Sequence, residues 1–308
     1  MLAAAYWLVQ QGAQIINFSG SGFVSPLDGS AALDRYIDLS TQAGKSGGTT
    51  WIVAAGNQAQ LHWAGDIRDN NHNGWVDLGT GASPSPLGDL IALEVGQTGP
   101  VSITLNWSPW GRAAADLDAF LYRVDANGKS SLVAQADTPQ GSDNPHPVEQ
   151  IQRTLDAGVY LLGLRASRLT GKGRVHVFVS GAQRMLPVIA AGSVGSPGTA
   201  RNAITVGALR ANDEGIEAYS GLGPTDDGRN KPELFAHWPA PTSGAASFRG
   251  TSAATPVVTG AAALLAAKTG NASAANLRQA LRAASTPRRD AAGWGDLSAQ
   301  ALATNTRR

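Results

Sequence analysis

The chain has 308 residues, of which 43% are apolar and 15% charged, and its formal net charge is +1. This composition fits one large or two ordinary globular domains and gives no reason to expect a nucleic-acid partner. Cysteine is absent, which excludes disulfides and thiolate metal sites. There is no apolar run of about 18 residues, so we expect no membrane span.

The first 61 residues alternate between helical and strand patterns. Residues 2–11 and 31–43 have helical apolar spacing, and AQIINFSG (13–20) and TTWIVAAGN (49–57) are typical of buried parallel strands. Gly12 fits the end of the first helix. This alternation favours an α/β fold with a parallel sheet.

Residues 62–190 follow a different pattern. Apolar residues alternate with polar ones in VSITLNWS (101–108), and RVHVFVSG (174–181) repeats this period of two. Between them lie DLDAFLYRV, SLVAQA and GVYLLGLRA, separated by turns rich in Gly, Asn, Asp and Pro. Several short strands joined by regular turns predict an antiparallel β-sandwich.

The α/β pattern returns near residue 191. ITVGAL (204–209) predicts a strand, and residues 255–267 and 273–284 predict helices. Ser273 is the expected N-cap of the last helix, and Pro256 is expected in the first turn of the helix before it. We therefore predict an α/β domain made of residues 1–61 and 191–308, interrupted by an inserted β-sandwich at residues 62–190.

A serine stands at the start of the predicted core helix, in GTSAATP (250–256). The unpaired N–H groups and the positive dipole at a helix N-terminus would favour an anion forming at Ser252. Taken alone, however, the pattern is better explained by Thr251 or Ser252 capping the helix. Asn57, which follows a glycine at a strand end, is by itself better explained as a turn residue.

Four segments together resemble the subtilisin-like serine proteases (subtilases), and they occur in the order of that family. GTSAATPVVTG (250–260) resembles the nucleophile motif, and WIVAAGN (51–57) resembles the oxyanion strand. IINFSGSG (15–22) resembles the strand that lines the substrate channel, and ITVGAL with SGLGP and KPE (204–233) resembles the segment before the nucleophile. The resemblance covers roughly residues 1–61 and 192–308, and it implies a partial subtilisin-like parallel sheet flanked by helices.

The resemblance implies a serine endopeptidase that acts on a peptide or protein. Ser252 would attack the scissile carbonyl, and the Asn57 amide and the Ser252 N–H would donate to the oxyanion. Ser19, Gly20 and Ser21 would form one rim of the substrate cleft. An extracellular or cell-envelope location is implied as well.

The proton acceptor that Ser252 needs is not evident in the sequence. In subtilases an Asp and then a His precede the serine, and residues 1–16 contain neither. Met1 also leads directly into the predicted helix without a capping residue. We interpret the chain as N-terminally truncated and inactive alone, with an unpaired sheet edge and exposed apolar surface. The histidines present are interpreted as surface or structural residues: His62, His72, His146, His176 and His237.

Two alternatives remain open. In the first, the chain is a non-catalytic pseudoprotease scaffold. In the second, the protease-like part only carries a β-sandwich that binds glycan or protein. An intact Ser252 motif together with an intact Asn57 motif favours the endopeptidase.

Oxygen-bearing residues in the segment DNNHNGWVD (69–77) are spaced as in a calcium-binding loop. Counted from the first Asp, the predicted Ca²⁺ ligands lie at positions 1, 3, 5, 7 and 9: Asp69, Asn71, Asn73, the Trp75 carbonyl and Asp77. Thr80 stands where a bidentate Glu is expected, and the alternative is an Asx-rich turn without metal. Asp116 and Asp118 are a second pair of candidate oxygens, for which we favour a solvated strand face.

Overall fold

The computed structural model describes residues 1–42, 48–79, 87–111, 115–169, 172–210, 215–238, 248–288, 293–298 and 302. Contacts within the chain separate it into two compact units. Unit 1 comprises residues 1–57 and 191–308, and unit 2 comprises residues 58–190.

Unit 1 is built on a sheet in the order β1-β2-β12-β13-β15-β14. The strands that run parallel to one another in this sheet are β1 (Ile15–Phe18), β2 (Thr50–Ala54), β12 (Ile204–Leu209), β13 (Leu234–His237) and β15 (Gly295–Leu297). The last strand, β14 (Ser285–Thr286), pairs antiparallel with β15. Every residue of β2 and β12 is buried, as expected of central strands covered on both faces. The predicted α/β fold with a parallel sheet is confirmed.

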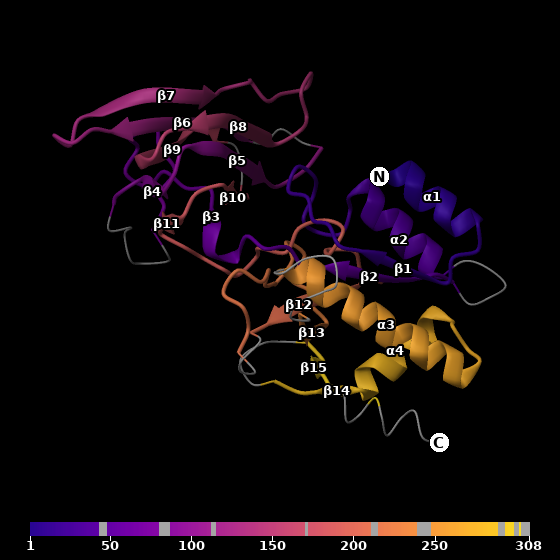
Figure 1. Cartoon of the computed structure of the whole chain (residues 1–308). Coiled ribbons are helices and arrows are strands. Elements are labelled where there is room, and N and C mark those ends of the chain that lie inside the picture. The colour runs from indigo at the N-terminus through magenta and orange to yellow at the C-terminus, as the bar shows by residue number, and fades with distance from the viewer. Residues whose placement is uncertain are drawn as a thin grey trace. The chain divides into compact units, whose positions relative to one another are not determined.

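Helices cover both faces of this sheet (Figure 1). Because side chains of a strand alternate between faces, Trp51 and Val53 of β2 join one apolar cluster and Ile52 joins another. The first cluster includes residues of α1 (Leu2–Gln10) and α2 (Ala32–Gln42), and the second includes residues of α3 (Thr251–Thr269) and α4 (Ala274–Ala283). Two helices therefore bury each face.

The predicted starts of the last two helices can be compared with the observed starts of α3 and α4. Ser273 caps α4 as predicted, because its side chain accepts a hydrogen bond from the Asn276 N–H. The start predicted for α3 is wrong: the helix begins at Thr251 rather than at residue 255, with Gly250 as its N-cap at a φ of 111°. Pro256 consequently lies inside α3 and not in its first turn.

Unit 2 contains two antiparallel sheets, in the orders β3-β10-β5-β8 and β11-β4-β9-β6-β7. The first consists of β3 (His62–Asp66), β10 (Arg174–Ser180), β5 (Gly99–Trp107) and β8 (Val148–Leu155). The second consists of β11 (Arg184–Leu186), β4 (Leu90–Val95), β9 (Gly158–Leu169), β6 (Ala115–Val124) and β7 (Ser130–Ala136). A short 3-10 helix, η1 (Ala59–Leu61), precedes β3.

One apolar cluster contains buried residues of both sheets of unit 2. Ile103 and Leu105 of β5 and Val177 of β10 belong to it, together with Leu121 of β6 and Leu162 of β9. The period-two pattern of the sequence is confirmed in β5 and β10, whose alternate apolar residues all join this core.

Unit 1 exposes apolar side chains close to a free sheet edge. β1 is an edge strand, and it pairs only with β2 among the described residues. Tyr6 and Trp7 of α1 are 56% and 60% exposed, and Leu39 of α2 is 67% exposed. α1 and α2 also line an open, mostly apolar hollow of about 560 Å³. These features match the predicted unpaired edge and apolar surface.

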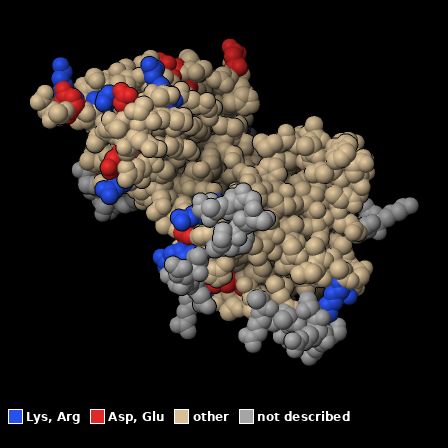
Figure 2. Space-filling view, viewed as in Figure 1, with Lys and Arg blue, Asp and Glu red and all other residues tan. Residues whose placement is uncertain are grey.

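Charged side chains are sparse on the visible face, where Lys and Arg are scattered among acidic groups (Figure 2). No helix in the described part of the chain is long and apolar enough to cross a membrane.

Candidate active site

The structure brings the predicted nucleophile and the predicted oxyanion donor together. Asn57 follows β2, and Ser252 is the second residue of α3. The Asn57 Oδ1 accepts hydrogen bonds from the N–H and from the Oγ1 of Thr251, both at 2.9 Å. Asn57 therefore contacts the residue that directly precedes Ser252. Asn57 and Ser252 themselves are 195 positions apart in the sequence (252 − 57).

These contacts fix the orientation of the Asn57 amide. A backbone N–H can only donate, so the amide atom facing Thr251 must be the oxygen. The Thr251 hydroxyl also accepts from the Gly56 N–H at 3.2 Å, which leaves its proton for Asn57. The Nδ2 donor consequently faces away from Thr251. A donor held in place before a reaction costs no reorganisation when charge develops. We did not predict this role of Thr251, although it stands between Gly250 and Ser252 in the quoted motif.

Gly250 allows the helix to approach Asn57 closely. A Cβ at this position would lie 2.9 Å from the Asn57 Nδ2, and the φ of 111° is one that side-chain-bearing residues rarely adopt. The Gly250 N–H donates to the Tyr219 hydroxyl at 3.2 Å. Burial raises the pKa of Tyr219, and the nearby Glu217 adds to this, so the phenol stays neutral. The contact of Tyr219 with Gly250 was not predicted from the sequence either, because no motif or residue spacing points to Tyr219.

Ser252 makes a reciprocal pair of hydrogen bonds with Ser19. The Ser252 Oγ donates to the Ser19 carbonyl at 2.9 Å, and the Ser19 Oγ donates to the Ser252 carbonyl at 3.0 Å. Pro256 has no N–H to occupy that carbonyl within α3, which leaves it available to Ser19. Within the described residues no group accepts from the Ser252 N–H. This N–H lies in the first turn of α3, where orphan donors favour an anion.

The predicted substrate rim begins at this contact. Ser19 touches Ser252, and Gly20 and Ser21 continue to Gly22, which pairs antiparallel with Ser196. The Ser21 Oγ is buried and has no hydrogen-bond partner among the described residues.

No histidine in the described part of the chain hydrogen-bonds to Ser252. His237, at the end of β13, contacts the Arg210 carbonyl through its Nδ1 at 2.9 Å. His62 and His176 bind one another within unit 2 at 3.1 Å. The Ser252 hydroxyl thus points at a carbonyl, which can accept a hydrogen bond but cannot serve as a general base.

A family model matches the part of the chain that contains Ser252. The model of the Subtilase family, Peptidase S8, matches residues 124–300, more than half of the chain. The chain belongs to the subtilase family. Membership indicates a serine protease-like function and a peptide or protein as the substrate class.

Solved structures resemble this subtilase to different degrees. The CspB protease of Clostridium perfringens aligns with a TM-score of 0.63 at 18% identity, over 97% of this chain and 67% of its own. It shares the fold. The protease domain of PatA (TM-score 0.31, 22% identity, 38% of this chain and 45% of its own) aligns less well. So does the pre-peptidase C-terminal domain of collagenase from Bacillus anthracis (TM-score 0.25, 11% identity, 39% of this chain and 87% of its own). These two TM-scores are too low to carry an argument. No curated protein matches the chain.

The predicted calcium loop of this subtilase chain forms a tight turn in unit 2. The two carboxylate oxygens of Asp69 accept from the Asn73 and Gly74 N–H groups at 3.0 and 2.9 Å. The Asn73 Oδ1 accepts from the Trp75 N–H at 2.9 Å, and the Asp77 Oδ2 accepts from the Asn70 N–H at 3.0 Å. The side-chain oxygens of the loop therefore accept hydrogen bonds from the loop's own backbone, which is the pattern of an Asx-rich turn.

Asp89 joins this loop from outside it. Its Oδ2 accepts from the side-chain amides of Asn73 at 2.7 Å and Asn71 at 3.3 Å. Thr80, the twelfth loop position, lies outside the described residues. No group of three or more His, Asp or Glu in the described ranges is arranged to hold a metal. A cation here would depend on amide and main-chain oxygens as well as carboxylates.

The interpretation of Asp116 and Asp118 as a solvated strand face is wrong for Asp118. Its side chain is buried and accepts a hydrogen bond from the Ser167 hydroxyl. Burial raises the pKa of Asp118. Asp116 is half-buried and accepts from the Gln140 N–H at 2.9 Å. The loop from β7 to β8 covers this part of β6, which the strand pattern alone does not reveal.

Proposed function

We propose that this chain supplies the nucleophile and the oxyanion hole of a serine endopeptidase. The observation that carries the proposal is the Asn57 amide, whose oxygen is held by two donors of Thr251 beside Ser252. In the reaction the Ser252 Oγ attacks the carbonyl carbon of a peptide bond. The Asn57 Nδ2 and the Ser252 N–H donate to the oxyanion, and Ser19, Gly20 and Ser21 line the substrate.

We further propose that the base comes from polypeptide outside these 308 residues. The hydroxyl proton must pass to a His oriented by an Asp, and no described residue offers this arrangement. The free edge of β1 and the exposed apolar side chains of α1 are where an added strand and helix would pack. Without the base, turnover falls by a factor on the order of 10⁶, as loss of the serine or histidine does in subtilisin.

A fluorophosphonate probe tests both parts of this proposal. We expect negligible labelling of the chain as given. A chain extended by its natural upstream residues, with a D-T/S-G and an H-G-T-H motif, is expected to label at Ser252. The matched control is Ser252→Ala in the extended chain, which should abolish labelling while leaving the thermal unfolding unchanged. An extended, folded chain that carries both motifs and still does not label would contradict the endopeptidase.

The alternative is a non-catalytic pseudoprotease scaffold. The Ser252 hydroxyl bonded to the Ser19 carbonyl favours it, because this contact leaves the serine unactivated. It would be supported by an upstream sequence without either motif and by a stable, monodisperse chain that never labels. Under either function we propose that unit 2 is an inserted β-sandwich domain and that the protein is extracellular or at the cell envelope.

We also propose that the loop of residues 69–77 binds Ca²⁺. Asp69, Asn71, Asn73, the Trp75 carbonyl and Asp77 would provide the oxygens, which suit a hard cation. The position of Asp89 supports the proposal, because its carboxylate stands beside the amides of Asn71 and Asn73. It would replace the Glu that is expected at the twelfth position.

Calcium titration of the full chain checks this site. With a dissociation constant of about 0.1–1 mM, as in extracellular modules, 10 mM Ca²⁺ should stabilise unit 2 by about 1.4–2.7 kcal/mol. The measurement is thermal unfolding with Ca²⁺ against EDTA, with Mg²⁺ as the ion control. Asp89→Asn should remove the shift, whereas Asp143→Asn, an exposed loop position in the same unit, should keep it. An equal shift in both variants would exclude the loop as the site.

A further inference from the structure

The substrate rim, residues 19–21, is held in place at both ends. At one end the side chains of Ser19 and Ser252 each donate a hydrogen bond to the carbonyl of the other residue. At the other end Gly22 and Ser196 form an antiparallel bridge. The Gly22 N–H donates to the Ser196 carbonyl at 2.7 Å, and the Ser196 N–H donates to the Gly22 carbonyl at 3.0 Å. The position of this second end therefore depends on what fixes Ser196.

Gly195, the neighbour of Ser196, packs directly against the rim. A Cβ at this position would overlap the Ser21 Oγ and would lie 2.8 Å from the Gly22 carbonyl oxygen, which leaves no room for a side chain. The Gly195 N–H donates to the Ala55 carbonyl at 3.3 Å, directly after the end of β2. This segment thus lies between the rim and the part of the chain that continues to the oxyanion donor.

Asp34, in the first turn of α2, binds the segment through its buried side chain. It is 0% exposed, and its Oδ1 and Oδ2 bind the Ser196 Oγ at 2.6 Å and the Thr199 Oγ1 at 2.5 Å. Burial raises the pKa of Asp34. The two bonds do not depend on its charge, because a protonated carboxyl would donate to one hydroxyl and still accept from the other. Asp34 therefore holds the segment in either protonation state.

We propose that Asp34 is a positioning residue for peptide binding, which holds Ser196 in place and thereby fixes the Gly22 end of the substrate rim. The inference rests on the proposed function, because that function assigns the rim to the substrate. Asp34 is enclosed and acts only through Ser196. Loss of this hold should displace the backbone groups that an extended peptide would pair with. Such pairing stabilises the bound substrate and the transition state alike, so its loss should raise KM and leave kcat unchanged.

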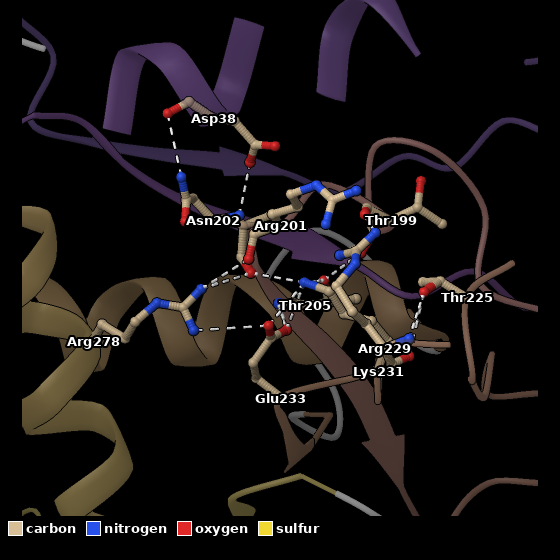
Figure 3. Close-up of polar contacts among 12 residues, drawn as sticks. Asp38, Thr199, Arg201, Asn202, Thr205, Thr225, Arg229, Lys231, Glu233 and Arg278 are labelled. Atoms are coloured by element: carbon tan, nitrogen blue, oxygen red, sulfur yellow. Dashed lines mark hydrogen bonds and ion pairs between the residues drawn. The ribbon is translucent and has the colours of Figure 1, made fainter. Parts of the chain in front are cut away.

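Asp38, one helical turn after Asp34, provides the matched control. Its Oδ1 accepts a hydrogen bond from the Asn202 N–H at 2.7 Å (Figure 3). The Asp38 side chain thus also joins α2 to the chain that follows Ser196, but at Asn202, which has no hydrogen bond to the rim among the described residues. Asp38→Ala therefore removes a bond of the same kind without reaching the rim.

Hydrogen exchange of the chain as given tests whether Asp34 holds the rim. We expect the Gly22 amide to lose protection about two- to tenfold in Asp34→Ala, the effect of losing one hydrogen bond, and to keep it in Asp38→Ala. Ser196→Ala removes only the linking hydroxyl and serves should Asp34→Ala not fold; it should lower the protection of Gly22 as well. Protection of Gly22 that stays unchanged in the folded variant would overturn the proposal.

Peptide hydrolysis by the extended chain tests the effect on substrate binding. Asp34→Ala, or Ser196→Ala in its place, should raise KM about tenfold and leave kcat and fluorophosphonate labelling within about threefold. Asp38→Ala should leave KM unchanged. An equal KM in these variants, or a fall in kcat at constant KM, would overturn the role of Asp34, while labelling of Ser252 in the natural extended chain would still support the endopeptidase. An extended chain that never labels would overturn both.

Discussion

Replacing Lys231 by methionine is expected to lower the free energy of unfolding of unit 1 by about 3–5 kcal/mol. Lys231 is buried, and its Nζ donates to the Glu233 carboxylate at 2.8 and 3.0 Å (Figure 3). The same ammonium donates to the Ala203 carbonyl at 2.9 Å and to the Thr205 hydroxyl at 3.1 Å. Methionine fills similar volume but leaves the Glu233 carboxylate buried without its main counter-ion.

The double variant Lys231→Met/Glu233→Gln separates charge from packing. Removing the carboxylate charge should recover at least about half of the loss, because breaking one side of a buried pair costs more than removing both charges. Arg278, 3.7 Å from Glu233, and the Thr205 N–H, 2.8 Å from it, remain in both variants. Urea unfolding at pH 7 is the measurement. A single variant within about 1 kcal/mol of the natural chain would show that Lys231 does not hold Glu233.

Gly250→Ala is expected to reduce the labelling rate of Ser252 in the extended chain by about 10²–10³, the effect of losing an oxyanion donor. The new Cβ would meet the Asn57 Nδ2 at 2.9 Å, and either the amide or the start of α3 must move. The strained φ adds a stability cost of about 1–3 kcal/mol.

The matched control for this variant is at the other end of the same helix. Gly270 ends α3 at a φ of 62°, and a Cβ there would meet nothing within 4 Å. Gly270→Ala should therefore cost stability through backbone strain alone and leave the labelling rate unchanged. Equal labelling rates in the two variants would show that close approach of Gly250 to Asn57 is not required.

Some of the candidate site could be predicted because its residues stand in short, ordered segments. Ser252 and Asn57 each belong to such a segment, and the structure brings the two together through Thr251. Tyr219 and Asp89 could not be predicted in this way. Each reaches its partner from a distant part of the chain, and neither has a spacing that marks it.

The sequence by itself determined the alternation of helix and strand in unit 1 and the inward faces of β5 and β10, because these depend on local apolar periodicity. Tertiary structure alone decided where α3 begins. GTSAA has no helical spacing, and Thr251 joins the helix while its N–H and hydroxyl bind Asn57. It also decided that Asp118 is buried and bonded to the Ser167 hydroxyl, since this partner comes from a distant strand and no local pattern records it.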